Sequence, residues 1–322
     1  MKSLLIAGGT GFFGKSFISA FEAGLLAKWG IQQLIIAARH ASQFAQNTQA
    51  RRTPNVFYID LDFSQHCELP DCDYIMHFAG SSDSAAYQKN LNKEIHNLEQ
   101  NMLSFVKSIE RSPAKPQNIL FVSSGAVYGP TSDNFFSETT PLNRERQFAC
   151  SKQHYARAKL FSERTFCRLN KKNRKLSIAR AFSFVGPSLP LNSHFVAGNL
   201  IRNILMQEPL HVSAFHSVKR SYLHTDDLIV WLMEILLNGS RDGEIFNVGS
   251  DDCVEIHKLA KELANKFNLG TDIEHISNSE TDLYVPDITK ARSIGLEVRY
   301  SSAEAILRTI KTHQHRLLRN CV

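Results

Sequence analysis

The sequence predicts an α/β protein, with a Rossmann-type, doubly wound parallel sheet followed by a smaller C-terminal α/β domain. Short apolar runs recur through the first 186 residues, and they are continuous rather than alternating, as expected of strands buried on both faces of a parallel sheet. Amphipathic stretches of helical spacing separate these runs. Strand and helix alternating in this way are typical of a doubly wound sheet.

Six strands are expected in the first domain. The apolar runs that predict them span residues 3–7, 33–38, 56–60, 74–79, 118–124 and 176–182. Helices are expected between the strands, where apolar residues stand three or four positions apart. Two such groups are Phe17, Ile18, Phe21 and Leu25 after Gly14, and Leu98, Met102 and Phe105 after Asn97.

The strand and helix pattern loosens after residue 186, where prolines and turn residues become frequent. We therefore expect a first domain over residues 1–186 and a second over residues 187–322. Helices of the second part are expected near residues 195–207, 225–238 and 255–268. The segment "GEIFNVGS", residues 243–250, predicts a short strand that returns to the first sheet.

Composition excludes several classes of protein. The 322 residues are 43% hydrophobic, enough for one large core or two modest ones. A formal net charge of +6 favours anionic ligands but falls well short of a nucleic-acid-binding arm. The six cysteines show no paired CxxC spacing. No apolar run approaches the roughly 20 residues of a membrane span. We expect a cytoplasmic protein with no metal site, no nucleic-acid partner and no membrane anchor.

A glycine-rich turn follows the first expected strand. In "LLIAGGTGFFG", residues 4–14, Gly8, Gly11 and Gly14 stand three apart, directly before the first amphipathic helix. Glycine lets the backbone turn sharply and approach a pyrophosphate, whose charge then lies at the helix N-terminus. The turn therefore predicts nucleotide binding, and the alternative is a tight turn with a purely structural role.

The end of the second strand bears on the choice between NAD and NADP, because an acidic residue there accepts hydrogen bonds from the free ribose hydroxyl of NAD. Here Ala37 and Ala38 precede Arg39 and His40. An arginine without a nearby carboxylate suits the 2′-phosphate of NADP. We favour NADP over NAD, with a solvated arginine at the start of a helix as the alternative.

Two further strand ends are expected to contact the same cofactor. The third strand ends in "YIDLD", where Asp60 and Leu61 are placed to meet an adenine edge. The fourth ends in "HFAGSS", where Ala79 and Gly80 let the backbone lie beside the cofactor. Small residues are also common in loops after strands, so the order of these segments along the chain supports the prediction more than any one of them.

A serine, a tyrosine and a lysine follow at a spacing suited to catalysis. Ser124 ends the fifth strand, Tyr155 comes 31 residues later, and Lys159 lies one helical turn beyond it. A free phenol has a pKa of about 10, so it is a poor base near neutral pH until a cation stabilises the phenolate. We expect Tyr155 to exchange a proton with a sugar hydroxyl during hydride transfer, while Ser124 holds the reacting oxygen. Taken singly, each residue also has an ordinary structural explanation.

These motifs together resemble the extended short-chain dehydrogenase/reductases, specifically the NAD-dependent epimerase/dehydratase group that acts on nucleotide-activated sugars. The resemblance runs nearly end to end. Its motifs stand here as "GGTGFFG", "HFAG", "HNLEQN", "SSGAVYG" and "YARAK", followed by "RAFSFVGP", "RSYLHTDDL", "FNVGS" and "YVPDITKA".

The resemblance implies a cofactor domain and a C-terminal substrate domain that binds a nucleotide diphosphate sugar. The catalytic residues it implies are Ser124, Tyr155 and Lys159. The cofactor-binding residues we predict are Gly8, Thr10, Gly11, Phe12, Phe13, Gly14, Arg39, Asp60, Leu61, Phe78, Ala79, Gly80, Asn97, Tyr155 and Lys159. The substrate-binding residues are Ser82, Ser124, Ser183, Asn199 and Arg220. Members are usually homodimers, paired through the helices that here lie near residues 90–108 and 151–168.

Some positions depart from the family pattern. Gly125 and Ala126 stand where sugar 4,6-dehydratases carry Asp-Glu, which disfavours a dehydratase. Ser183 replaces a usual asparagine, and "SETDL" before Tyr284 lacks an arginine that several members place on the substrate phosphate. A nucleotide-sugar oxidoreductase acting at C4 is the resulting prediction, by epimerisation or by 4-keto reduction. A non-catalytic dinucleotide-binding regulator is the alternative from another class, and the nucleotide base and the sugar stay open.

Overall fold

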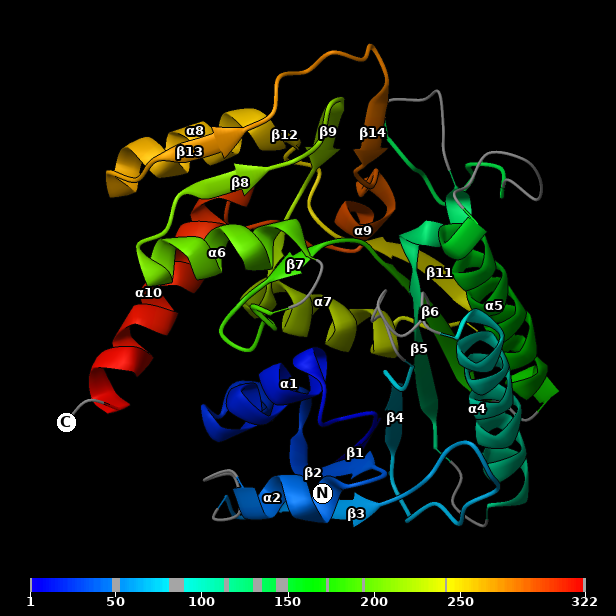
Figure 1. The fold of residues 1–322 in the computed structure, drawn as a ribbon. Coiled ribbons are helices and arrows are strands. Elements are labelled where there is room, and N and C mark those ends of the chain that lie inside the picture. The colour runs from blue at the N-terminus through cyan, green and yellow to red at the C-terminus, as the bar shows by residue number, and fades with distance from the viewer. Residues whose placement is uncertain are drawn as a thin grey trace. The chain divides into compact units, whose positions relative to one another are not determined.

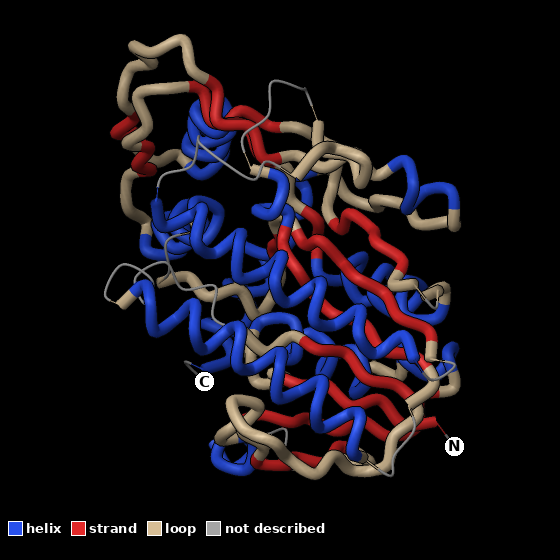
Figure 2. The backbone as a smooth tube through the Cα atoms, turned by 90° about the vertical axis from the view of Figure 1, so that its right-hand side faces the viewer, coloured by secondary structure: helices blue, strands red, loops and turns tan. Residues whose placement is uncertain are grey.

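A computed structural model describes residues 2–47, 53–80, 90–112, 116–129, 135–142, 150–171, 174–192, 195–240 and 242–320. Of residues 150–153, 171 and 317–320 the backbone alone is described. Figures 1 and 2 show the ribbon and the backbone trace from two sides.

The chain divides into two compact units, each built from three separate segments. The first unit contains Met1–Val127, Phe148–Arg180 and Ile229–Phe246, and the second contains Tyr128–Gln147, Ala181–Leu228 and Asn247–Val322. The sequence predicts a boundary after residue 186 and a return of residues 243–250 to the first sheet, whereas the chain passes between the two units several times.

A seven-stranded sheet forms the centre of the first unit, and it confirms the predicted doubly wound fold. The strands are β1 (Lys2–Ala7), β2 (Ile31–Ala38), β3 (Val56–Asp60), β4 (Tyr74–His77), β5 (Asn118–Ser124), β6 (Lys175–Ala181) and β11 (Glu244–Val248). Their order across the sheet is β11-β6-β5-β4-β1-β2-β3. The pairs β1–β2, β2–β3, β1–β4 and β4–β5 are parallel. The strand order reverses between β1 and β4, where ligands of such sheets bind at the carboxyl ends of the strands.

The continuous apolar runs form strands because both faces of the sheet are covered. Leu4, Leu5 and Ile6 of β1 are fully buried, and every residue of β5 is buried. Burying one such side chain contributes about 1.5–3 kcal/mol relative to leaving it in water. A continuous apolar run therefore predicts a strand strongly wherever neighbouring elements cover both faces of that strand.

The helices of the first unit cover the sheet. They are α1 (Phe12–Glu22), η1 (Leu25–Trp29), α2 (Ala41–Asn47), α4 (Leu91–Arg111), η3 (Gly125–Tyr128), α5 (Cys150–Phe166), η4 (Cys167–Lys171) and most of α7 (Thr225–Leu237). Helices α4 and α5 pack side by side (Figure 1), and Figure 2 looks onto them in front of the strands. The Asn90 side chain caps α4 by accepting a hydrogen bond from the Lys93 amide.

One of the expected helical contacts is wrong. Leu25 was grouped with Phe17, Ile18 and Phe21 on one helical face, but α1 ends at Glu22 and Leu25 is 55% exposed. Gly24, with a positive φ of 71°, separates α1 from the short helix η1. The helical spacing of apolar residues therefore continues beyond the end of α1, where the left-handed Gly24 stops the helix.

The described residues of the second unit form three small sheets and several helices. The strands pair as β7 (Phe184–Val185) with β10 (Leu223–His224), β8 (Leu210–Val212) with β13 (Thr271–Ile273), and β9 (Ser217–Arg220) with β12 (Val254–Glu255) and β14 (Thr281–Tyr284). The helices are α6 (Val196–Met206), α8 (Ile256–Phe267), α9 (Thr289–Ser293) and α10 (Ser302–Asn320). The helices expected near 195–207, 225–238 and 255–268 are present as α6, α7 and α8, but most of α7 belongs to the first unit and not to the second.

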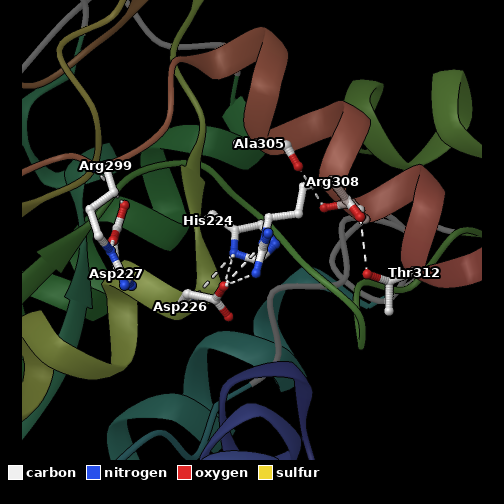
Figure 3. A network of polar contacts seen from close by, with 8 residues as sticks. His224, Asp226, Asp227, Arg299, Ala305, Arg308 and Thr312 are labelled. Carbon is white, nitrogen blue, oxygen red and sulfur yellow. Dashed lines mark hydrogen bonds and ion pairs between the residues drawn. The ribbon is translucent and has the colours of Figure 1, made fainter.

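Polar contacts fix the start of α7 to α10 and to the segment that leads into α10 (Figure 3). Asp226 accepts a hydrogen bond from Arg308 Nε at 3.1 Å and lies 3.3 Å from His224 Nδ1. The hydrogen bond from His224 is the main reason why the pKa of Asp226 is lowered. The buried Asp227 accepts from the backbone and the guanidinium of Arg299. Two carboxylates in the first turn of a helix also interact favourably with its dipole.

Across the described parts of the chain, no helix combines the length and the apolar character that crossing a membrane requires.

Candidate active site

The turn between β1 and α1 contains two glycines that the protein's own packing requires. Gly8 has a φ of +79°, and a Cβ atom there would lie 2.6 Å from the backbone nitrogen of Ala79. A Cβ atom on Gly14 would lie 2.0 Å from the carbonyl oxygen of Gly9. Both distances are impossible for real side chains, so the structural explanation accounts for Gly8 and Gly14 without any ligand.

Gly11 has no such structural reason. It is exposed, its φ is −79°, and a Cβ atom there would meet its nearest neighbour, the Gly8 carbonyl oxygen, at 3.5 Å. Gly11 is also the N-cap of α1, and no side chain caps the first amides of this helix. A helix N-terminus with uncapped amides favours an anion, and a glycine beside it lets a phosphate approach. The turn therefore fits the diphosphate of a dinucleotide.

Aromatic side chains surround this turn. Phe12 and Phe13 open α1 with their ring centroids 5.6 Å apart, and Phe13 meets Phe78 edge to face at 5.7 Å. Phe78 also donates its backbone amide to the carbonyl of Ala7 at the end of β1. The predicted cofactor residues Thr10, Phe12, Phe13 and Phe78 are half-buried, so their backbones and side chains help to shape the turn.

The ends of β2 and β3 lie side by side, with Ala38 paired to Asp60. The Asp60 carboxylate accepts hydrogen bonds from the amide and the hydroxyl of Ser42, and the hydroxyl contributes most to lowering the pKa of Asp60. The predicted adenine neighbour Leu61 is half-buried, and its amide donates to Ala38. The acidic side chain nearest the end of β2 is therefore already engaged within the protein.

Arg39 is exposed, as expected of a residue that binds a phosphate from solvent. The premise that it has no nearby carboxylate is wrong, because its positive charge helps to lower the pKa of Asp62. The main cause of that lowered pKa is the hydrogen bond from the Ser64 amide. Asp62 is thus an acidic neighbour of Arg39.

Beyond β4, Gly80 lies close to Lys159. A Cβ atom on Gly80 would lie 2.8 Å from Leu98 Cδ2 and 3.8 Å from Lys159 Nζ, and the φ of Gly80 is +146°. The half-buried Asn97 precedes Leu98 on α4. The structure therefore brings the fourth-strand motif, the helix asparagine and the lysine of "YARAK" into one region of the first unit.

Lys159 is 6% exposed and packs beside Tyr155 on α5. Its Nζ donates a hydrogen bond to the Val122 carbonyl at 3.2 Å, and it lies 5.2 Å from the centroid of the Phe121 ring and 5.8 Å from that of Tyr155. Burial lowers the pKa of Lys159 to about 8, and the charge of Glu163 opposes this shift. A lysine in this state carries a positive charge at pH 7 in a largely water-excluded place.

Ser124 ends the strand to which Lys159 is hydrogen-bonded. It is buried, and its hydroxyl oxygen accepts a hydrogen bond from the Ala126 amide at 3.2 Å. Tyr155 is half-buried and packs against Leu98 and Ala158. The fifth strand and α5 thus carry the three predicted catalytic residues in the first unit, with Tyr155 and Lys159 in direct proximity.

Sequence reasoning missed three residues beside this group. Glu163, one helical turn after Lys159, accepts hydrogen bonds from Ser123 Oγ at 2.6 Å and from Arg180 Nη2 at 2.8 Å. All three side chains are buried. The spacing of Tyr155, Lys159 and Glu163 at intervals of four places them on one helical face, which is a signal that the sequence contained.

The predicted substrate residues of the second unit lie on separate elements. Ser183 is half-buried between β6 and β7, and Asn199 is half-buried on α6. Arg220, at the end of β9, donates to the Asp282 backbone carbonyl and to its carboxylate, both at 2.7 Å. The guanidinium that was assigned to a substrate phosphate is therefore paired with an acid. The remaining candidate, Ser82, lies outside the described residues.

Solved structures of nucleotide-sugar enzymes have the same fold. DesIV, a dTDP-glucose 4,6-dehydratase from Streptomyces venezuelae, matches with a TM-score of 0.78 and 20% identity over 97% of each chain. UDP-glucuronic acid 4-epimerase from Bacillus cereus matches with a TM-score of 0.77 and 18% identity over 98% of this chain and 99% of that one. UDP-glucose 4-epimerase from Thermotoga maritima matches with a TM-score of 0.76 and 19% identity over the same shares. At these identities the likeness establishes the fold alone.

The family follows from the sequence itself. The model of the NAD-dependent epimerase/dehydratase family matches residues 4–249, which is most of the chain. The matched region contains the glycine turn after β1, the fourth-strand motif and the "YARAK" segment. Because the match covers most of the chain, from within β1 to the end of β11, and includes the motifs at the strand ends, the chain belongs to the NAD-dependent epimerase/dehydratase family.

Proposed function

We propose that this protein is an NAD(P)-dependent oxidoreductase that acts on C4 of a nucleotide diphosphate sugar, with Tyr155 as the acid and base. The observation that carries the proposal is the buried Lys159 beside Tyr155, held by the carbonyl of Val122. A cation in this position stabilises a phenolate, and a lysine with no such role rarely occupies a buried site.

Side chains of this protein carry out the proton transfer. A free phenol needs its pKa lowered by roughly 3 units, or about 4 kcal/mol, to act as a base near pH 7. The positive charge of Lys159 supplies part of this stabilisation, and its pKa of about 8 keeps it protonated at pH 7. Tyr155 then removes the proton of the sugar hydroxyl, or returns it in the reverse direction, while Ser124 orients the reacting oxygen.

The dinucleotide, when bound, supplies the acceptor or donor of the hydride. The uncapped N-terminus of α1 at Gly11 would hold its diphosphate, and Gly80 and Asn97 would lie along its nicotinamide half. Arg39 supports a preference for NADP, whereas its neighbour Asp62 weakens that preference. NAD is bound in the solved structures of DesIV and the Bacillus cereus epimerase, which supports NAD as the second possibility.

A nucleotide sugar is the substrate class that the relatives support. The Bacillus cereus structure contains UDP-glucuronic acid, and the Thermotoga maritima structure contains UDP-glucose. On this chain we assign Ser82, Ser124 and Ser183 to the sugar, and Asn199 and Arg220 to the nucleotide and its phosphates. An arginine suits a phosphate because its planar fork donates two hydrogen bonds, and here this requires Arg220 to share or release Asp282.

Gly125 and Ala126 argue against the dehydratase reaction. Elimination of water needs an additional acid and base, and neither residue has a side chain that moves a proton. Epimerisation and 4-keto reduction remain as the two candidate reactions. Stoichiometric loss of NADPH with a keto-sugar identifies a reductase, and product formed without net cofactor turnover identifies an epimerase.

The proposal is tested with Tyr155→Phe. We expect turnover of the best nucleotide sugar to fall by about 10²- to 10⁴-fold, the usual contribution of an acid and base, because the phenol is lost. Binding of the dinucleotide, measured by calorimetry, should stay within a few-fold of the wild-type affinity. A Tyr155→Phe protein with full turnover would refute the assignment. A wild-type protein that binds the dinucleotide tightly but converts no UDP-, dTDP-, CDP- or GDP-sugar would instead support the regulator.

A further inference from the structure

Helix α5 carries an acidic residue in line with the proposed catalytic pair. Tyr155, Lys159 and Glu163 follow one another at intervals of four residues, so they form one row along the helix. Lys159 and Glu163 are both buried, the latter only 5% exposed. A carboxylate is almost never buried to this degree unless it is paired, so its partners indicate what it does.

The partners of Glu163 fix its carboxylate in place. Its Oε1 accepts from Ser123 Oγ at 2.6 Å and from Arg180 Nε at 3.1 Å, and its Oε2 accepts from Arg180 Nη2 at 2.8 Å. The pair with Arg180 is bidentate, which is the geometry of the strongest carboxylate contacts. Both side chains are shielded from water, at 3% exposure for Arg180 and 7% for Glu163. Three hydrogen bonds from two strands, β5 and β6, therefore fix the carboxylate.

Lys159 needs an opposing charge to stay cationic. It is almost fully removed from water, and burial disfavours the ammonium form. Among the described residues, the titratable groups that act on or lie beside Lys159 are His77 on β4 and Tyr155 and Glu163 on its own helix, and Arg180 on β6 pairs with Glu163. His77 is uncharged near neutral pH because burial lowers its pKa to about 3. Glu163 is the acidic residue of this group, and its charge favours protonated Lys159.

We propose that Glu163, fixed by Arg180 and Ser123, is a positioning residue that keeps Lys159 protonated beside Tyr155. The proposal deepens the proposed function and rests on it for its catalytic meaning. Glu163 contacts neither substrate nor cofactor in this scheme, because it acts on the phenol through the ammonium group. Arg180 serves to hold Glu163 in place rather than to approach the reacting atoms.

The sign of the effect follows from the charges. Removing the negative charge of Glu163 removes an interaction that favours protonated Lys159, so the pKa of Lys159 should fall below its value of about 8. Because activity requires the cation, the fall of kcat/KM at alkaline pH should move to lower pH by the same amount. A purely structural Glu163 would lower activity at every pH and leave the position of this alkaline limb unchanged.

The direct test measures the titration of Lys159 without any turnover. The protein is labelled with ¹³C at lysine Cε, and the Lys159 signal is assigned by its loss in Lys159→Met. We expect Glu163→Gln to lower the midpoint of this signal by about 1 pH unit, the effect of one neighbouring charge. Glu163→Asp keeps the charge and should restore most of the wild-type midpoint. An unchanged midpoint in Glu163→Gln, or an equal shift in Glu163→Asp, would overturn the proposal.

A second variant guards against misfolding. Glu163→Gln leaves Arg180 buried without its partner, which is costly, whereas Glu163→Gln with Arg180→Met removes both charges. The double variant should fold, as checked by its thermal unfolding. Its Lys159 midpoint should lie between those of Glu163→Gln and the wild type, because losing the positive charge of Arg180 offsets part of the loss of Glu163. A midpoint above that of the wild type would contradict the proposal, because Arg180 would then influence Lys159 more than Glu163 does. If the midpoints shift as expected but no nucleotide sugar is converted, the proposed function fails while the effect of Glu163 on Lys159 stands.

Discussion

Arg39 presents an exposed guanidinium at the end of β2, where a carboxylate would favour NAD. A phosphate bound by an arginine is a charged hydrogen bond, worth about 1.5–3 kcal/mol. We therefore expect Arg39→Ala to weaken NADP binding by roughly 10- to 150-fold. Its effect on NAD binding should be less than a few-fold, because NAD has no 2′-phosphate to lose. Calorimetric titration of both dinucleotides measures the two changes.

Asp62 provides the control for Arg39. Arg39 is one of the groups that lower the pKa of Asp62, after the hydrogen bond from Ser64, so the two side chains attract each other. Asp62→Asn should therefore release Arg39 and strengthen NADP binding. If Arg39→Ala weakens NAD and NADP equally, or if the wild-type protein prefers NAD, Arg39 is a solvated surface residue and the prediction is wrong.

The glycine turn connects a strand to a helix, and its glycines serve different purposes. A Cβ atom on Gly14 would collide with the backbone of Gly9, at 2.0 Å, and backbone atoms cannot rotate away. We expect Gly14→Ala to destabilise the protein by at least about 2–3 kcal/mol, beyond any gain in helix propensity. A Cβ atom on Gly11 meets no protein atom closer than 3.5 Å, so Gly11→Ala should change stability by less than about 0.5 kcal/mol.

Gly14→Ala should mainly lower stability, whereas Gly11→Ala should mainly lower the affinity for the dinucleotide. The added methyl group of Gly11→Ala would lie where the proposed function places a phosphate against the uncapped amides of α1, so dinucleotide affinity should fall by about tenfold or more. Urea unfolding and calorimetric titration of both purified variants check this. A Gly11→Ala protein that binds the dinucleotide as tightly as the wild type would show that this turn is structural only.

The elements of the central sheet were predicted from local sequence because the signal is local. A continuous apolar run marks each strand, and β3 and β5 have the predicted bounds. The fourth strand ends two residues before the predicted position 79, because the chain leaves the sheet after His77 to reach Ala79 and Gly80. Helix α1 likewise ends just before the left-handed Gly24, and the spacing of apolar residues does not predict this end.

The missing parts of the site depend on contacts between distant residues. Arg220 and Asp282 are 62 positions apart, and Glu163 and Arg180 are joined across a helix and a strand. Periodicity shows that Glu163 shares a face with Lys159, but it does not show which cation holds Glu163 in place. The residue types at the site were predictable, whereas their partners required the fold.

At the scale of the molecule, the two units are interleaved along the chain. The first unit is completed by Ile229–Phe246, which contains most of α7 and the start of β11. Within it, Trp231 is fully buried and Glu234 accepts a hydrogen bond from Trp29 at 2.8 Å. The first unit is therefore not a continuous piece of sequence, and cutting the chain after residue 186 would remove part of its core.

Acid sensitivity is a property of the whole fold, and His77 is expected to contribute to it. His77 is 1% exposed in the centre of the sheet, packed against Phe63, Phe105 and Phe121. Burial, together with the charge of Lys159, lowers its pKa to about 3 from an ordinary value of 6.5. Below pH 6.5 the unfolded chain binds a proton that the folded protein does not bind. Stability is therefore lost as the pH falls towards 3, by up to about 1.4 kcal/mol per pH unit.

His77→Leu tests this contribution, because leucine fills a similar volume without a titrating group. Between pH 7.5 and pH 5 the wild type should lose about 2 kcal/mol more of its free energy of unfolding than the variant does. Replacing the exposed His96 on α4 by glutamine is the matched control, and it should leave the pH dependence unchanged. Urea unfolding at a series of pH values gives these free energies. Parallel curves for the wild type and His77→Leu would mean that His77 takes up a proton inside the folded protein, and Lys159 would then face a second buried cation.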